Sequence, residues 1–238
     1  MSKLLKIDFI ELITISLFLS LLFSCSPKKK VAITFDDGPD SLYTEMILDV
    51  LKEKNVKASF FLVGKNIEKY PEVVKRIKNE NHLIGNHSYS HPRLRKITKI
   101  DSVEKEFAVV DSLLENIIGV KPLYYRPPFG KITDSQKELL DQKQSKIVMW
   151  SLDTKDYKID DVTKDDIVTK VKENIHENAI ILFHSTNANP ERAARFKNFQ
   201  NTVDALPEII DFLKTEGYEL VTIEQIPDKM KFLKGKSY

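Results

Sequence analysis

Residues 31–39 read VAITFDDGP: an almost uninterrupted apolar run, then two adjacent carboxylates and a Gly-Pro pair. A short apolar run bounded by turn residues is typical of a strand buried on both faces, as in parallel sheets. We therefore predict a strand over Val31–Phe35. Asp36 and Asp37 follow it directly, and taken alone they fit a turn or a helix cap. Because two adjacent carboxylates repel each other, they also need a cation or a hydrogen-bond donor nearby.

Short apolar runs continue to alternate with amphipathic segments along the chain. Further strands are predicted over 58–63, 82–86, 123–125, 146–151, 179–184 and 218–223, with helices over 41–54, 71–80, 101–118, 133–144, 163–176 and 202–215. Ser41 is the candidate N-cap of the first helix, and Gly119 ends the longest one. The pattern predicts a parallel α/β protein of about seven strands with outer helices, in a single barrel-like domain.

Composition excludes several classes of protein. The 238 residues allow one domain or two small ones, and 42% hydrophobic with 30% charged residues excludes a disordered chain. The net charge of +2, from 37 basic and 35 acidic residues, gives no support to a nucleic-acid partner. One cysteine excludes internal disulfides and any metal site built from several cysteines.

Residues 1–24 are predicted to be a signal sequence. Two lysines precede the uncharged, largely apolar run Leu12–Phe23, which is too short to cross a bilayer of ~30 Å comfortably. Leu22-Phe23-Ser24-Cys25 resembles a bacterial lipobox, in which the cysteine is lipidated. We expect an exported lipoprotein, anchored to the membrane at Cys25 and facing the periplasm or the cell surface. The alternative is an uncleaved signal anchor in which Cys25 is an inert thiol.

Three segments follow the signal sequence. Residues 25–30 are predicted to form a short linker, 31–226 the α/β domain, and 227–238 a Lys-rich tail. From Lys229 onward the tail is expected to be a solvated extension. The sequence shows no internal repeat and no second linker.

Polar residues with catalytic chemistry follow five of the predicted strands. Asp36 and Asp37 follow the first, His87 and His91 the third, Arg126 the fourth, and Asp153 and Asp156 the fifth, while His184 ends the sixth. Each has an ordinary structural explanation alone; a lone His184, for example, would be a core histidine with a satisfied hydrogen bond. Because the carboxyl ends of parallel strands open on one face, we expect these side chains to converge there.

Such a set of side chains is typical of a metal-dependent hydrolase. Two imidazoles and one carboxylate make a three-ligand site with an open position for water. A metal there acidifies its water and polarises a carbonyl group. The remaining carboxylate can accept a proton, and the remaining histidine can return one to a leaving group.

Five segments, in order, carry a resemblance to a known family. They are Thr34-Phe35-Asp36-Asp37-Gly38-Pro39, His87-Ser88-Tyr89-Ser90-His91, Arg126-Pro127-Pro128-Phe129-Gly130, Asp153-Thr154-Lys155-Asp156-Tyr157 and Leu182-Phe183-His184. Together they resemble the polysaccharide deacetylase family, the NodB-homology carbohydrate esterases of family 4, over about Val31 to Ile223. The resemblance implies a distorted (β/α) barrel and metal-dependent removal of N- or O-acetyl groups from sugars.

The resemblance also implies a role for each site residue. Asp37, His87 and His91 would bind the metal, Asp36 would be the general base held by Arg126, and His184 would be the general acid tuned by Asp156. The backbone N–H of Phe129 would bind the oxyanion, and Leu182 and Tyr157 would line the pocket for the acetyl methyl group. Zinc suits these ligands, although cobalt, nickel or iron(II) could occupy the same site.

Three residues depart from the family pattern. Tyr157 stands where tryptophan is usual, Phe129 where tyrosine is frequent, and Ser185 where aspartate is frequent. The aromatic wall at Tyr157 is kept with a changed shape, and the change at Phe129 is harmless if only its backbone acts.

The expected function is hydrolysis of linear amides in N-acetylglucosamine units of peptidoglycan or another chitin-like envelope glycan. One alternative is an O-acetyl esterase acting on a xylan-like glycan, and another is a non-catalytic glycan-binding module on the same scaffold. Two His and one carboxylate also occur in non-haem iron oxygenases, and Asp36 with Asp156 could be the acid pair of a glycoside hydrolase. No protein partner is inferable.

Overall fold

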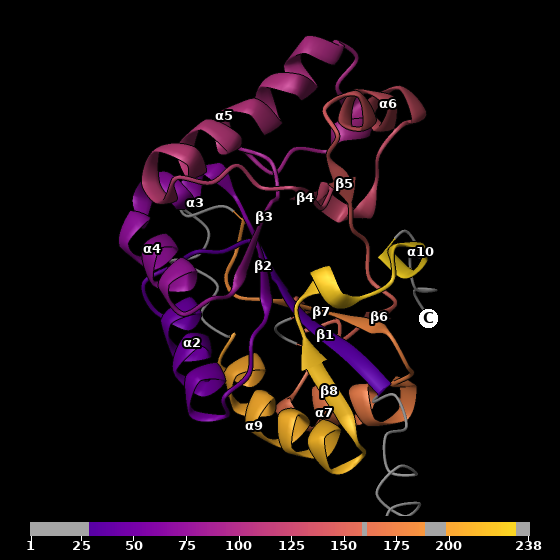
Figure 1. Ribbon diagram of the computed structural model, residues 1–238. Helices are drawn as coiled ribbons and strands as arrows, with labels where there is room; N and C mark the ends of the chain where they lie inside the picture. The colour runs from indigo at the N-terminus through magenta and orange to yellow at the C-terminus, as the bar shows by residue number, and fades with distance from the viewer. Residues whose placement is uncertain (1–28, 159–160, 189–198, 232–238) are drawn as a thin grey trace, which may run out of the picture.

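A parallel sheet curls around an interior and carries helices on its outside (Figure 1). The computed structural model describes residues 29–158, 161–188 and 199–231. The predicted signal sequence, with Cys25, lies outside the described residues. No helix within these three ranges is long and apolar enough to cross a bilayer. The predicted distorted (β/α) barrel is confirmed.

The described residues form eight parallel strands. Along the sheet the order is β5-β4-β3-β2-β1-β7-β6, and β8 pairs with the first half of β1. The strands are β1 (Lys29–Asp36), β2 (Ser59–Leu62), β3 (Leu83–Asn86), β4 (Tyr124–Tyr125), β5 (Lys146–Ile147), β6 (Leu152–Asp153), β7 (Ala179–His184) and β8 (Tyr218–Val221).

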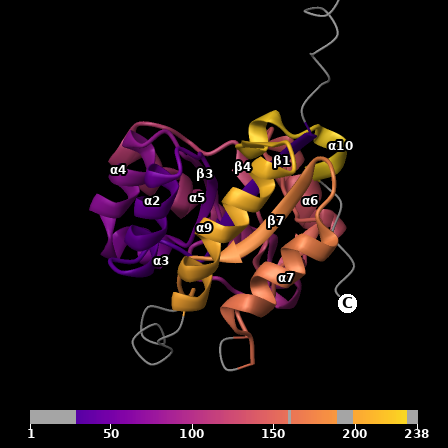
Figure 2. The same cartoon turned by 90° about the horizontal axis from the view of Figure 1, so that it is seen from below.

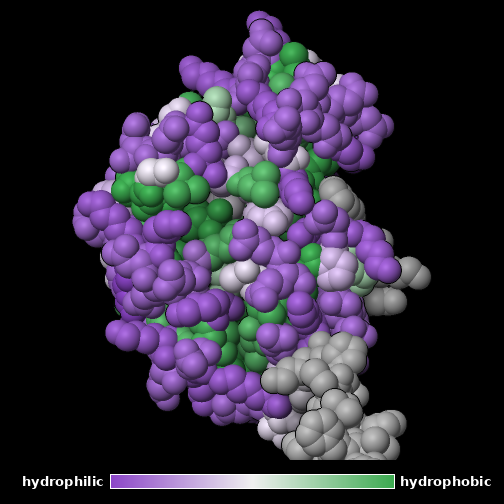
Figure 3. Space-filling model, viewed as in Figure 1, coloured by the Kyte–Doolittle hydropathy of each residue, from purple (hydrophilic) through white to green (hydrophobic). Residues whose placement is uncertain are grey.

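The central strand β1 has a different core on each of its faces. Val31, Ile33 and Phe35 pack between the sheet and the outer helices, whereas Ala32 belongs to an apolar cluster inside the barrel. Because side chains alternate along a strand, Thr34 and Asp36 share the inward face with Ala32. Hydrophilic residues cover most of the outer face seen in Figure 3, with hydrophobic residues in smaller areas between them.

All six predicted helices are present, and the described residues add two further helices, α3 and α10. The helices are α2 (Tyr43–Glu53), α3 (Gly64–Lys69), α4 (Pro71–Asn79), α5 (Ile100–Ile118), α6 (Asp134–Gln142), α7 (Lys164–Asn174), α9 (Gln200–Thr215) and α10 (Asp228–Lys231), with short 3-10 turns η1 (Leu94–Lys96), η2 (Pro128–Gly130) and η3 (Ile223–Gln225). Gly119 ends α5 in a left-handed conformation, as predicted. Helices α7 and α9 lie side by side (Figure 2).

The predicted N-cap of α2 is wrong by one residue. The capping oxygen comes from Asp40 and not from Ser41. Asp40 Oδ1 accepts hydrogen bonds from the backbone N–H groups of Leu42 at 3.2 Å and Thr44 at 2.8 Å. Thr44 Oγ1 in turn accepts from the Asp40 N–H at 3.0 Å. A carboxylate also suits the positive end of the helix dipole better than a hydroxyl does.

The continuous strand predicted over 146–151 is also wrong. Strand β5 pairs with β4 at one end of the sheet, whereas β6 pairs with β7 at the other. The residues between them therefore cross the open side of the barrel, and Val148 and Trp150 are buried inside it. An apolar run alone cannot distinguish a strand from a buried crossing segment.

One residue of the predicted Lys-rich tail, Lys231, is packed and not solvated, which corrects the prediction at this position, whereas Lys229 is exposed as predicted. Residues 232–238 lie outside the described residues. Lys231 ends α10 and is 2% exposed. Its ammonium group donates to Asp228 Oδ1 at 2.8 Å and lies 5.1 Å from the centre of the Tyr124 ring. The Met149 N–H also donates to the Lys231 carbonyl at 2.7 Å. Charge composition missed this contact, because a lysine stem can bury its methylenes against an aromatic ring.

Candidate active site

The predicted site residues gather at the carboxyl ends of the parallel strands. Asp36 ends β1 and His184 ends β7, while His87 follows β3 directly and Arg126 follows β4. Asp156 lies three residues beyond β6. The convergence expected from strand order alone is confirmed.

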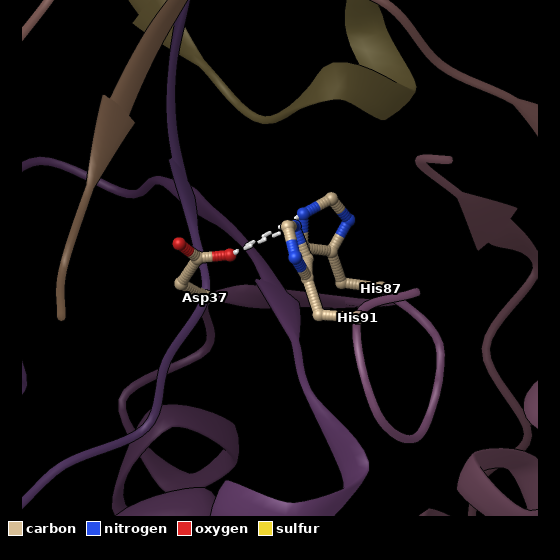
Figure 4. Close-up of side chains that lie close together, drawn as sticks. All are labelled: Asp37, His87 and His91. Atoms are coloured by element: carbon tan, nitrogen blue, oxygen red, sulfur yellow. Dashed lines mark ion pairs between the residues drawn. The ribbon is translucent and has the colours of Figure 1, made fainter. Parts of the chain in front are cut away.

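Asp37, His87 and His91 bring three potential metal-ligating atoms together (Figure 4). Asp37 Oδ1 lies 3.5 Å from His87 Nε2 and 3.4 Å from His91 Nε2. All three ligand atoms lie within 4.8 Å of one another. The close-up shows both rings turned toward the same carboxylate oxygen.

Both imidazoles are held in their neutral form. The His87 Nδ1 lies 2.6 Å from the Arg126 carbonyl oxygen. A carbonyl only accepts, so Nδ1 carries the proton and the Nε2 lone pair faces Asp37. Burial lowers the pKa of His87 to about 3 and that of His91 to about 4. The contacts with Asp37 are therefore not salt bridges.

These three residues fit a divalent cation. Asp37 Oδ1 is buried and has no hydrogen-bond partner among the described residues. Burial raises the pKa of Asp37, and this effect outweighs His91, His184 and a backbone hydrogen bond from Ala188, which lower it. A cation beside the unpartnered Oδ1 would favour the ionised carboxylate. Carboxylate and imidazole ligands suit zinc and related first-row cations.

The backbone adopts a left-handed conformation at several site positions. Asp37 has a φ angle of 74°, Ser88 of 67°, His91 of 54° and Phe129 of 58°. Non-glycine residues avoid this region, and such strain is concentrated at functional sites. The His91 N–H donates to Ser88 Oγ at 3.1 Å, which holds the tight loop that returns His91 toward His87.

Arg126 holds the predicted base, Asp36. The Arg126 Nη1 donates to Asp36 Oδ1 at 2.7 Å, and Asp36 Oδ2 lies 3.6 Å from His87 Nε2. One carboxylate oxygen is therefore occupied by the guanidinium, and the other lies beside the predicted metal ligands. Asp36 is 3% exposed and Arg126 is fully buried, so water screens this ion pair weakly.

Further hydrogen bonds and an aromatic contact hold the Arg126 side chain in place. Its Nη1 also donates to Thr34 Oγ1 at 2.9 Å, and Thr34 donates onward to the Ile181 carbonyl at 2.7 Å. The Nη2 donates to the Met149 carbonyl at 3.1 Å, and the guanidinium carbon lies 4.0 Å from the centre of the Phe61 ring. A rigid planar fork with five donors suits this position better than a lysine would.

His184 and Asp156 form the second ion pair of the site. The His184 Nδ1 donates to Asp156 Oδ1 at 2.8 Å. Asp156 Oδ2 accepts from the Thr202 hydroxyl at 3.0 Å. Burial opposes the charge on His184, but Asp156 outweighs burial and raises the pKa of the imidazole to about 10. His184 is therefore an acid that carries its proton at neutral pH.

The residues predicted to contact the substrate lie around these pairs. The Phe129 ring packs edge-on against His91, 4.7 Å between ring centres, and Tyr157 packs edge-on against His184 at 5.2 Å. Both aromatic side chains are exposed. Leu182 is buried inside the barrel, on the inward face of β7 that also carries His184. Their roles toward a substrate stay predictions.

Sequence reasoning missed the neighbours that hold the site together. Thr34 and Thr202 each bond a member of an ion pair, although both lie in segments that the family resemblance includes. Thr34 could have been found from strand alternation, because it shares the inward face with Asp36. Nothing in the sequence marks Thr202 as a partner of Asp156, 46 residues away.

Ser185, a departure from the family pattern, has a structural explanation. Its N–H and its hydroxyl both donate to the Asp36 carbonyl, at 3.1 Å and 3.3 Å. A Cβ atom on Gly38 would lie 2.5 Å from Ser185 Oγ. Ser185 therefore links the end of β7 to the end of β1 by hydrogen bonds. Its hydroxyl occupies space that is free only because residue 38 is a glycine.

The geometry disfavours two of the alternative functions. Both oxygens of Asp156 and one oxygen of Asp36 are occupied by internal donors, which leaves no pair of free carboxyls for glycoside hydrolysis. The facial triad of non-haem iron oxygenases commonly sits on an all-β jelly roll, whereas this sheet is parallel and surrounded by helices.

A parallel barrel with this histidine and carboxylate set at its carboxyl edge fits a metal-dependent hydrolase. Residues 24–148 match the polysaccharide deacetylase family. The chain belongs to the polysaccharide deacetylase family, and it is a hydrolase of that class.

Individual relatives agree with this assignment. A peptidoglycan-N-acetylglucosamine deacetylase of Bacillus cereus is 44% identical over 196 residues, which cover 82% of this chain and 67% of that protein. The peptidoglycan-N-acetylmuramic acid deacetylase PdaC of Bacillus subtilis is 34% identical over 209 residues, 88% of this chain and 41% of that protein. A crystal structure of a peptidoglycan N-acetylglucosamine deacetylase in complex with 4-naphthalen-1-yl-N-oxidanyl-benzamide superposes with a TM-score of 0.77 at 43% identity, covering 84% of this chain and 88% of that one.

Proposed function

We propose that this chain is a metal-dependent deacetylase that hydrolyses the N-acetyl groups of N-acetylglucosamine units in peptidoglycan or another chitin-like envelope glycan. The observation that carries the proposal is the unpartnered Asp37 Oδ1 between two neutral imidazoles, with the carboxylate of Asp36 3.6 Å from His87. Asp37, His87 and His91 would hold the cation, with zinc favoured. When bound, such a cation supplies Lewis acidity, which polarises an amide carbonyl and makes water more acidic.

Asp36 accepts the proton of the attacking water in this proposal. Its Oδ1 is held by Arg126, so the side chain keeps one orientation and offers Oδ2 to the substrate side. A positioned base of this kind contributes about 10²–10⁴-fold to the rate.

His184 donates a proton to the amine that leaves the acetyl group. Its Nδ1–H is bound by Asp156, so Nε2 is the nitrogen that can deliver the proton. The pKa of about 10 keeps that nitrogen protonated at neutral pH. The Phe129 backbone N–H is proposed to stabilise the oxyanion, where one well-placed donor is worth roughly 3 kcal/mol. Leu182 and Tyr157 are proposed to enclose the acetyl methyl group.

The choice of glycan is supported by the relatives. The Bacillus cereus and Bacillus subtilis proteins are named for peptidoglycan, one for its N-acetylglucosamine and the other for its N-acetylmuramic acid. The amide of N-acetylglucosamine is the proposed substrate because the relative named for it has the higher identity, 44% against 34%, and the match covers more of that relative's own length, 67% against 41%.

The direct test is release of acetate from defined substrates. Purified, zinc-loaded protein is incubated with N-acetylated peptidoglycan, chitooligosaccharides and acetylated xylan, and acetate is measured from each. We expect release from the two amide substrates. Release from xylan alone would make the protein an O-acetyl esterase, and glycan binding without any acetate would make it a binding module.

The variant Asp36→Asn tests whether Asp36 acts as the base or as a ligand of the metal. The substitution should lower turnover by about 10²-fold or more and leave the zinc content at that of the wild type. Full activity in this variant would remove Asp36 from the mechanism. Loss of both zinc and activity would instead make it a metal ligand.

We also propose that the protein is exported and held at the membrane by a lipid on Cys25. The support is the lipobox-like Leu22-Phe23-Ser24-Cys25 after an apolar run. Cys25→Ser in a bacterial host should move the protein out of the membrane fraction. A protein that stays there unchanged would favour the signal anchor.

A further inference from the structure

A basic groove lies beside the candidate metal site. It is a cavity of about 410 Å³ between the loop that follows His91 and the loop that follows Arg126. Arg93, Arg95, Lys96 and Lys131 supply its charge, and Phe129 is part of its wall. Among the described residues, no acidic side chain lines it.

The cations of this groove have no carboxylate partner among the described residues. None of the four makes an ion pair with a residue in the described ranges, whereas many lysines on the outer helices are paired, such as Lys172 with Glu208 at 2.9 Å. All four are exposed. Four like charges without carboxylate partners repel one another around one cavity. Binding of an anion in the groove therefore lowers the free energy of the protein.

Phe129 connects the groove to the metal site. The centre of its ring lies 4.7 Å from that of the His91 imidazole and 5.3 Å from the Arg93 guanidinium carbon. A residue that lines the groove is therefore in contact with a predicted metal ligand. A glycan that places its acetamide in the site has its neighbouring sugar within reach of these cations.

We propose that the basic groove binds a carboxylate carried by the glycan strand next to the sugar that is deacetylated. The proposal rests on the proposed function, since it assumes a glycan in the metal site. Peptidoglycan strands carry carboxylates on their stem peptides, or on the lactyl ethers of sugars that have lost the peptide, whereas chitin carries none. Two arginines in one groove favour this ligand, because a guanidinium binds a carboxylate through two parallel hydrogen bonds.

The groove predicts a charge-dependent preference between substrates. The test compares kcat/KM on peptidoglycan strands and on neutral chitooligosaccharides, for the wild type and for the triple variant Arg95→Gln/Lys96→Gln/Lys131→Gln. Arg93 is left in place because it packs on Phe129. We expect the ratio of peptidoglycan to chitooligosaccharide kcat/KM to fall roughly tenfold or more in the variant. Salt at about 1 M should lower the wild-type ratio in the same direction, since these charges are exposed.

A matched control removes the same charge elsewhere. Lys52, Lys78 and Lys121 are exposed and lie at or just beyond the carboxyl ends of α2, α4 and α5, away from the groove. The triple variant Lys52→Gln/Lys78→Gln/Lys121→Gln should keep the wild-type ratio. An equal fall in both triple variants would show a general effect of net charge and overturn the proposal, as would an unchanged ratio in the groove variant.

Two further measurements identify the carboxylate and separate the two proposals. Strands treated with an amidase expose the lactyl carboxylate, and untreated strands carry peptide carboxylates. The strand type whose kcat/KM falls more in the groove variant carries the carboxylate that the groove binds.

Strand binding by Asp36→Asn protein, with and without the groove substitutions, is measured by calorimetry. Binding that depends on the groove charges without any acetate from the wild type would support the groove and refute the proposed function.

Discussion

The two oxygens of the Asp156 carboxylate bind two different parts of His184. Oδ1 accepts from the ring Nδ1 at 2.8 Å, and Oδ2 accepts from the His184 backbone N–H at 2.7 Å. Ring and backbone are thus fixed to one rigid group, so the imidazole cannot turn away from the site without breaking a buried ion pair. The same carboxylate provides both the orientation and the high pKa of the acid.

Asp156→Asn should therefore lower the alkaline limit of activity. His184 acts in its protonated form, and Asp156 is the charge that raises its pKa to about 10 against the effect of burial. Without that charge, the pKa of His184 falls, and activity is lost at a lower pH as the pH is raised. The measurement is kcat between pH 6 and pH 10.

Asp153→Asn is the control for this variant. Asp153 lies in the same loop, where its carboxylate accepts from the Lys155 N–H and the Tyr157 hydroxyl and makes no contact with His184 among the described residues. It should keep the alkaline limit of the wild type. Identical pH profiles for Asp156→Asn and the wild type would remove Asp156 from the control of His184.

Asp37→Ala should abolish the stabilisation of the protein by zinc. A cation that binds only the folded state raises the melting temperature, and Asp37 supplies the single anionic ligand atom of the three. Thermal melts with chelator and with added zinc measure the difference. Asp36→Asn is the matched variant, since it changes the adjacent carboxylate, and it should keep the zinc-dependent shift. Equal shifts for Asp37→Ala and the wild type would place the metal elsewhere.

Arg126→Ala should destabilise the fold as well as the site. It leaves the Asp36 carboxylate buried without its partner, a change that costs about 3–5 kcal/mol of unfolding free energy. Urea denaturation measures the loss. Adding Asp36→Asn to this variant removes the stranded charge and should restore part of the stability. A double variant that is less stable than Arg126→Ala would show that the packing of the guanidinium, and not its charge, is what matters.

The metal-free protein should lose stability as the pH falls below about 6.5. Burial lowers the pKa of His82 to about 4, of His87 to about 3 and of His91 to about 4. In this range the unfolded chain takes up protons that the folded chain excludes, so acid favours unfolding. Burial raises the pKa of Asp37, so the folded chain takes up one proton at this carboxylate and the loss of stability is reduced by that amount. His184 contributes little in this pH range, because it is protonated in the folded chain and largely protonated in the unfolded chain. We expect a loss of about 1–3 kcal/mol per pH unit.

Urea denaturation in chelator at pH 7 and pH 5 tests this expectation. A saturating concentration of zinc should widen the difference, because protons compete with the cation for His87 and His91. Equal unfolding free energies at the two pH values would mean that the three imidazoles are protonated inside the folded protein.

Much of the site could be predicted from the sequence because several of its residues lie at the ends of strands. Asp36 and His184 end their strands, and parallel pairing alone brings them to one edge. The roles came from the family resemblance, since spacing cannot say which of two adjacent aspartates binds a cation. The structure separates them physically: Asp36 continues the inward face of β1, whereas Asp37 turns out of the strand with a φ angle of 74°.

The features that the sequence did not reveal are long-range or depend on context. The segment 146–151 has the composition of a strand, yet its ends pair with opposite edges of the sheet. Thr202 reaches Asp156 only because the first turn of α9 lies beside the loop that follows β6. The basic groove combines residues from two loops more than thirty positions apart in the chain. None of these follows from local periodicity, which reports neighbours a few residues away.

The segment that crosses between β5 and β6 holds the arginine that binds Asp36. Its carbonyl groups at Val148 and Met149 accept from Arg126, whose Nη1 reaches Asp36. The same guanidinium therefore contacts both the segment that joins the two ends of the sheet and the proposed base, Asp36. A substitution that displaces this segment would also remove two hydrogen-bond acceptors that hold Arg126 against Asp36. The orientation of the proposed base thus depends on a connection between opposite edges of the sheet.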